Sequence, residues 1–109
     1  MLSRFGFSAA TESVLHDAVQ EVFQSENVEV VPERILSARD RIDFYVPDGR
    51  VGVECKIDGS ATEVMRQLLR YTESPEISGI VLLTSRTKHR NIPATLGGKP
   101  VRVVLTRAF

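Results

Sequence analysis

Residues 41–57 read RIDFYVPDGRVGVECKI, and this stretch decides the expected fold. Two runs rich in strand-forming residues, 41–46 and 51–57, flank the dipeptide Asp48-Gly49, which is a strong signal for a two-residue hairpin turn. With these two residues at the turn, facing residues have numbers that sum to 97. The pattern therefore predicts an antiparallel hairpin in which Asp43 lies opposite Glu54.

The charged residues of this hairpin indicate a metal site. Side chains alternate along a strand, so Asp43 and Glu54 are expected on one face with Lys56 beside them. Facing β-carbons lie about 4.5–5.5 Å apart, and two carboxylates so close destabilise a hairpin unless a cation neutralises them. Mg²⁺ takes oxygen ligands and keeps several waters, which suits two carboxylates and a backbone carbonyl. The alternative is an ordinary polar face in which Lys56 pairs with either acid. The opposite face is expected to hold Ile42, Phe44, Val46, Val53, Cys55 and Ile57.

The sequence before the hairpin predicts one helix and one strand. Ser8 is expected to cap a helix over about residues 9–24, and residues 28–36 are rich in β-branched side chains. Pro32 in that strand implies an edge position or a bulge. The apolar stripe expected on the helix consists of Val14, Leu15, Ala18, Val19 and Val22.

The sequence after the hairpin predicts a second helix and two more strands. A capping box, Ser60 to Glu63, opens a helix over about 61–73. Its expected apolar stripe consists of Ala61, Val64, Met65, Leu68 and Leu69. Residues 79–84 are expected to form a strand buried on both faces, 85–98 a loop with at most a helical turn, and 100–106 a final strand. The order α-β-β-β-α-β-β predicts a single α/β domain, residues 1–109, with a mixed central sheet flanked by helices.

Charge and composition narrow the functional classes. The formal net charge is zero, but residues 1–33 carry one basic and six acidic residues (1 − 6 = −5), and residues 77–109 carry six basic and no acidic ones (+6). Such separation suits a polyanion partner, although a charged run is usually a solvated surface. There is no run of about 20 apolar residues and no secretory signal, so a cytoplasmic protein without a membrane partner is expected. The single Cys55 cannot form an internal disulfide.

Several helical residues could complete a site at the hairpin. Glu12 falls at the border of the first apolar stripe, where it could reach the sheet or simply favour the start of the helix. Gln67 and Tyr71 share one side of the second helix, and Arg66 and Arg70 form a parallel pair that could contact phosphate. Arg86, Lys88 and Arg90 form a basic stretch suited to a nucleic-acid backbone. His89 is expected to be a solvated loop residue or a phosphate neighbour rather than a catalytic base.

These residues, taken in order, resemble the PD-(D/E)XK nuclease superfamily. The resemblance spans residues 12–71: Glu12, Ile42-Asp43, Glu54-Cys55-Lys56 and Gln67-x-x-x-Tyr71. It implies a restriction-endonuclease-like αβββαβ core in which Asp43, Glu54 and the Cys55 carbonyl bind Mg²⁺ or Mn²⁺. Lys56 would be the catalytic lysine, Glu12 would assist at the metal or its water, and Gln67 and Tyr71 would position the site or the DNA. The family motif begins with Pro-Asp, where this chain has Ile42-Asp43.

The resemblance also suggests how the protein would act. A short chain without added lobes is similar to junction-resolving and phage-type nucleases, which work as homodimers in DNA recombination and repair. We therefore expect a Mg²⁺-dependent, structure-selective DNA endonuclease that needs no small-molecule cofactor. The Gln-x-x-x-Tyr element instead favours an end-processing exonuclease. A third possibility is a catalytically silent nucleic-acid-binding or interface module with the same fold.

Overall fold

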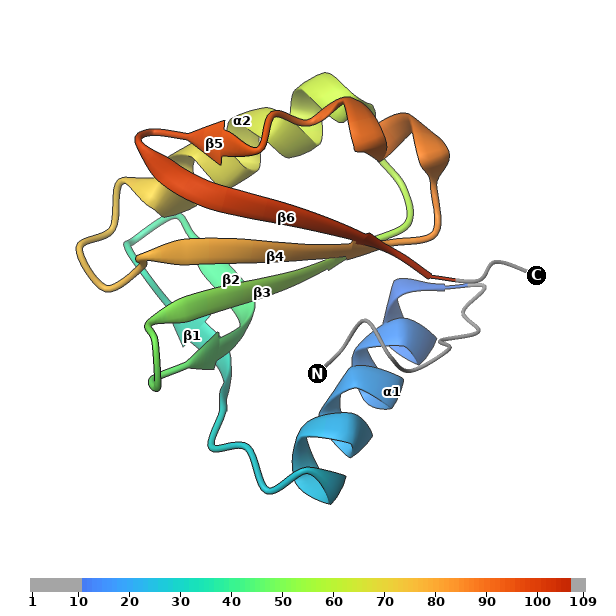
Figure 1. The fold of residues 1–109 in the computed structure, drawn as a ribbon, viewed down its shortest axis with the longest axis vertical. Coiled ribbons are helices and arrows are strands. Elements are labelled where there is room, and N and C mark those ends of the chain that lie inside the picture. Colours follow the sequence, from blue (N-terminus) through green and yellow to red (C-terminus); the bar gives the residue numbers. More distant parts are fainter. Residues whose placement is uncertain (1–10, 107–109) are drawn as a thin grey trace.

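The computed structural model describes residues 11–106, which form a six-stranded sheet with an α-helix on each face (Figure 1). In chain order, the elements are α1 (Glu12–Ser25), β1 (Val31–Ile35), β2 (Arg41–Val46), β3 (Val51–Lys56), α2 (Ala61–Thr72), β4 (Gly79–Thr84), the 3-10 turn η2 (Thr87–Asn91), β5 (Thr95–Leu96) and β6 (Lys99–Leu105). The expected order is confirmed; η2 is the helical turn allowed for in the segment 85–98, and the short β5 is an addition there.

The sheet is mixed, with strand order β1-β2-β3-β4-β6-β5. Strands β1, β2 and β3 form an antiparallel meander, whereas β3, β4 and β6 run parallel to one another. Parallel neighbours need a crossover, and α2 supplies the one from β3 to β4. The expected α/β class with a mixed sheet between helices is therefore confirmed.

Two hydrophobic clusters, one on each face, hold the helices to the sheet. Leu15, Val19 and Phe23 of α1 pack with Phe44 and Val53. On the other face, Val64, Leu68 and Tyr71 of α2 pack with Ile42, Ile80 and Leu82 of the sheet. Strand β4 contributes to both clusters, as expected for a strand covered on both sides.

Three expectations about the apolar faces are wrong. Val14 and Leu69 are exposed rather than packed inward. The buried side of α1 includes Phe23 and the buried side of α2 includes Tyr71, so each helix is turned slightly from the expected orientation. Ile42 lies in the α2-side cluster and not beside Phe44. Its side chain occupies the space above Gly52, where an added β-carbon would collide with it.

The ends of the elements follow their capping residues. Thr11 caps α1, with its hydroxyl accepting a hydrogen bond from Val14 N at 3.2 Å, and the expected cap, Ser8, lies outside the described residues. Ser60 caps α2 as expected and accepts from Glu63 N at 3.1 Å.

Strand β1 lies at the sheet edge, as Pro32 indicated, and the residue after Pro32, Glu33, has a φ of 55°. Within residues 11–106, no helix is both long enough and apolar enough to cross a bilayer.

Candidate functional site: two carboxylates at the end of a hairpin

The hairpin register is the expected one. Phe44 pairs with Val53, Tyr45 with Gly52 and Val46 with Val51, so the paired numbers sum to 97. The turn is closed by Arg50 N, which donates to Pro47 O at 3.1 Å, and Gly49 supplies the positive φ of 85°. This register brings Asp43 and Glu54 together at the open end of the hairpin.

The two carboxylates there accept hydrogen bonds from the backbone of the opposite strand. Asp43 N donates to Glu54 Oε1 at 3.1 Å, and Cys55 N donates to Asp43 Oδ2 at 2.8 Å. Each side chain therefore takes the place that a carbonyl has in a regular ladder. The expected shared face is not what the structure shows. Asp43 lines a pocket beside α1, whereas Glu54 reaches Tyr71 on the α2 side.

Glu54 is buried, with only 3% of its surface exposed. Burial, followed by repulsion from the Asp43 carboxylate, raises its pKa from 4.5 to about 8, and the Lys56 ammonium opposes that rise. The pKa of Asp43 is also raised, chiefly by burial, despite its hydrogen bond from Cys55. A cation bound beside the two acids would stabilise their charged forms and oppose both pKa shifts.

Lys56 lies where the sequence predicted it, on the same side as Glu54. Its Nζ atom is 3.6 Å from Glu54 Oε2, and its side chain is 22% exposed. The ammonium can therefore face both the buried acid and the solvent. The Cys55 thiol is buried, and burial raises its pKa far above neutrality, so the sulfur stays protonated.

Glu12 reaches the end of β3 from α1. Its Oε1 atom accepts from Ile57 N at 3.0 Å and from Asp58 N at 3.5 Å. The carboxylate thus fixes the backbone that follows Lys56, and Glu12 also lines the same pocket as Asp43. The sequence indicated that Glu12 could reach the sheet, and its contact with the backbone after β3 gives it a positioning role there.

Tyr71 contacts the site from α2, whereas its expected partner Gln67 does not. The Tyr71 hydroxyl is 3.2 Å from both Glu54 Oε2 and the Arg41 carbonyl. Burial, together with the Glu54 charge, raises the pKa of this phenol, so it acts as a hydrogen-bond donor. The Gln67 side chain is half-buried and makes no hydrogen bond within residues 11–106.

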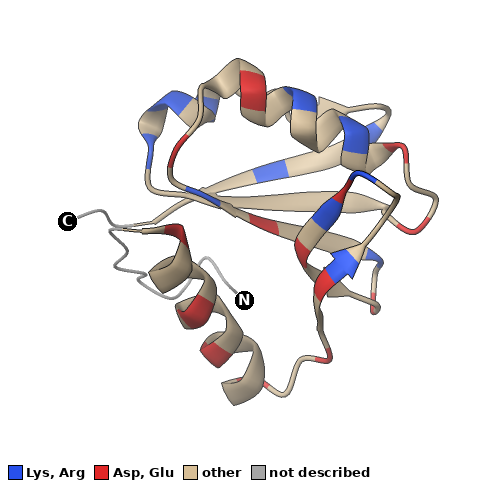
Figure 2. Cartoon of the chain, turned by 180° about the vertical axis from the view of Figure 1, so that it is seen from behind, with Lys and Arg blue, Asp and Glu red and all other residues tan. Residues whose placement is uncertain are grey.

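The basic residues have unequal environments. Arg70 Nε is 3.0 Å from Asp40 Oδ1, so this guanidinium is already paired. Arg86 Nε donates to the Ile57 carbonyl at 3.0 Å, which holds it next to the end of β3. Arg66, Lys88 and Arg90 are exposed. Figure 2 shows acidic residues along α1, whereas α2 carries both acidic and basic residues and η2 carries basic residues without an acidic one.

The expectation that His89 is solvated is wrong. His89 is fully buried, with Nδ1 2.6 Å from Thr84 Oγ1 and Nε2 2.8 Å from the Gly59 carbonyl. A carbonyl only accepts, so Nε2 carries the proton and Nδ1 accepts from the Thr84 hydroxyl. The ring joins η2 to the loop after β3, and together with Arg86 and Glu12 it fixes that loop.

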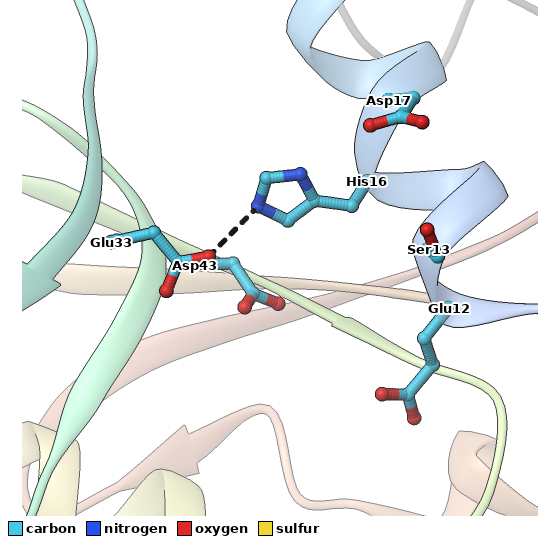
Figure 3. Close-up of a pocket in the computed structure, with 6 residues that line it drawn as sticks. All are labelled: Glu12, Ser13, His16, Asp17, Glu33 and Asp43. Carbon is cyan, nitrogen blue, oxygen red and sulfur yellow. Dashed lines mark ion pairs between the residues drawn. The ribbon is translucent and has the colours of Figure 1, made fainter.

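Two residues beside Asp43 were missed in the sequence. His16 and Glu33 line the pocket with it, and the three have possible ligand atoms within 4.8 Å of one another (Figure 3). A signal for His16 was present, because it lies four residues after Glu12 and thus on the same side of α1. The sequence carried no such signal for Glu33, because its position depends on a local backbone conformation with a φ of 55°. Compared with known proteins, the chain matches no family model, no curated protein and no solved structure.

Proposed function

We propose that this protein is a Mg²⁺-dependent nuclease with a restriction-endonuclease-like αβββαβ core, which hydrolyses DNA phosphodiester bonds. The observation that carries the proposal is the arrangement of Asp43 and Glu54. Each is bound to the backbone of the opposite strand, and Lys56 Nζ lies 3.6 Å from Glu54. Burial raises the pKa of both acids, so their charged forms are disfavoured at this point unless a cation is bound.

The donor set fits Mg²⁺ or Mn²⁺. Asp43 borders an open pocket, Glu54 accepts a hydrogen bond from Asp43 N, and a nearby cation would stabilise both carboxylates and lower their raised pKa values. The ion would be held by Asp43, Glu54 and the Cys55 carbonyl, with Glu12 at its water. When bound, it would polarise the phosphate and promote ionisation of water.

The chain's own side chains supply the remaining chemistry. Lys56 can orient the attacking water or offset the negative charge that develops on the phosphate in the transition state. Tyr71 and the backbone of Asp43 hold the Glu54 carboxylate in one orientation. Arg86, Lys88, Arg90 and Arg66 are the candidates for DNA backbone contacts, and Arg70 would have to leave Asp40 to join them.

We favour a structure-selective endonuclease that acts as a homodimer, since two sites could cut the two strands of a branched DNA. The contact between Tyr71 and Glu54 supports the alternative of an end-processing exonuclease, because it ties the Gln-x-x-x-Tyr element to the acids. The burial of Glu54 supports a silent binding module, because a protonated Glu54 is a poor metal ligand.

The test is cleavage of labelled four-way junction, flap and linear duplex DNA with Mg²⁺ or EDTA. We expect cleavage that requires Mg²⁺ and is abolished in Lys56→Ala. Lys99→Ala is the matched control, since Lys99 is partly buried like Lys56 but lies outside the acids and the candidate DNA contacts, with its Nζ donating to the Ser74 carbonyl. Equal cleavage by Lys56→Ala would exclude this site, and DNA binding without any cleavage would favour the silent module. The solution mass with and without junction DNA tests the dimer.

A further inference from the structure

The pocket beside Asp43 contains a second group of possible metal ligands. It has a volume of about 280 Å³ and is lined by Glu12, Ser13, His16, Asp17, Glu33 and Asp43. His16, Glu33 and Asp43 come from α1, β1 and β2 respectively, and Figure 3 shows them converging. Side chains from three separate elements meet here only in the folded chain.

His16 is oriented by packing and has an unused nitrogen. Its ring stacks on Phe44, with centroids 4.3 Å apart and planes tilted by 30°. This contact leaves Nε2 3.5 Å from Glu33 Oε1, and Nε2 is shielded from solvent without a hydrogen-bond partner among the described residues. A shielded imidazole nitrogen without a hydrogen bond is costly, and coordination to a cation would satisfy it.

Glu33 reaches this position through an uncommon backbone conformation. Its φ of 55° lies in the left-handed region, which a non-glycine residue adopts only at an energetic cost. The β1–β2 pairing skips Glu33 and Asp43, although the residues on either side are paired in register. Arg41 Nε holds Glu33 Oε2 at 2.9 Å, so that Oε1 faces His16. The kink thus turns a carboxylate of an edge strand toward the pocket.

We propose that His16, Glu33 and Asp43 bind a divalent transition-metal ion at a position distinct from the Mg²⁺ position between Asp43 and Glu54. One imidazole and two carboxylates suit Mn²⁺, Fe²⁺ or Zn²⁺ better than Mg²⁺, which prefers oxygen ligands. Asp43 is common to both positions and would bridge two cations. Any part that this ion plays in hydrolysis rests on the proposed nuclease function, but its binding does not.

The binding test uses the full chain with Mn²⁺ and no DNA. A directly bound imidazole nitrogen gives a characteristic coupling in pulsed electron paramagnetic resonance of Mn²⁺, and we expect that coupling in the unmodified protein. His16→Phe keeps the stacking on Phe44 but removes the nitrogen, so the coupling and one bound Mn²⁺ per chain should be lost. Glu33→Gln should weaken the same ion, whereas Glu29→Gln, which removes an exposed acid outside the pocket, should not.

The outcomes separate this inference from the nuclease proposal. A nitrogen coupling that disappears in His16→Phe supports the site even if no DNA is cleaved. No nitrogen coupling in the unmodified protein, or Mn²⁺ binding that is the same in His16→Phe and Glu33→Gln, would mean that His16 and Glu33 form an ion pair only, whatever the nuclease assay shows. Circular dichroism establishes whether each variant is folded. If His16→Phe does not fold, the test rests on Glu33→Gln, which alters only a half-exposed side chain.

Discussion

The Glu54→Gln variant should remove a pH dependence of stability in the metal-free protein. In the folded chain Glu54 keeps its proton up to a pKa of about 8, whereas the ordinary value is 4.5. Between these values the folded state binds more protons than the unfolded state, so the free energy of unfolding falls as pH rises. Each pKa unit corresponds to about 1.4 kcal/mol, so Glu54 accounts for a fall of at most about 5 kcal/mol. Asp43 contributes with the same sign.

Urea unfolding at several pH values between 4.5 and 8, in EDTA, measures this effect. The unmodified protein should lose stability toward pH 8, and Glu54→Gln should lose much less, because glutamine is neutral throughout and keeps an oxygen for Asp43 N. Glu29→Gln, at an exposed position, should behave like the unmodified protein. Adding Mg²⁺ should restore stability at pH 8. If the free energy of unfolding changes equally with pH in the unmodified protein and in Glu54→Gln, the conclusion that Glu54 is buried and protonated is refuted.

Three further predictions concern the framework around the site, each measured by urea unfolding. Gly52→Ala should destabilise the chain by about 1–3 kcal/mol, because the added methyl group meets Ile42 in a packed core. Gly98→Ala is the control, because its β-carbon has open space but its φ is positive, so it measures backbone strain without a collision. His89→Phe should cost about 1–3 kcal/mol, because the Gly59 carbonyl loses its donor; no loss would show that water replaces the ring. Thr11→Ala should cost about 1 kcal/mol through loss of the α1 cap, whereas Thr11→Ser should retain most of it; equal losses would contradict the capping role.

The sequence predicted the hairpin well because its signals are local. The Asp48-Gly49 turn fixes the register, and the alternation of residues along each strand then places Lys56 beside Glu54. The capping box at Ser60 likewise fixed the start of α2. These features depend on residues that are close in the chain, for which turn and capping preferences are reliable guides.

The features that the sequence did not reveal depend on tertiary contacts. The side chain of Ile42 crosses to the α2 side over Gly52, and the pairing of β1 with β2 skips Asp43. Strict alternation fails at that point, so the two acids do not share a face. His89 lies in a polar, basic stretch that reads as solvated, and only the fold brings the Thr84 hydroxyl and the Gly59 carbonyl to its ring.

The double role of the two acids decides which variants can test the chemistry. Asp43 and Glu54 each accept a hydrogen bond from a backbone N–H of the opposite strand, so replacing either with alanine would leave that donor unpaired. A buried donor left without a partner costs about 1–3 kcal/mol, and a loss of activity could then reflect a disturbed hairpin. Asp43→Asn and Glu54→Gln retain the accepting oxygen and remove the ionisable carboxyl group. The Lys56 side chain makes no hydrogen bond to the backbone of the described residues, and this side chain is partly exposed. Loss of cleavage in Lys56→Ala, with unfolding unchanged, therefore reports on the reaction itself.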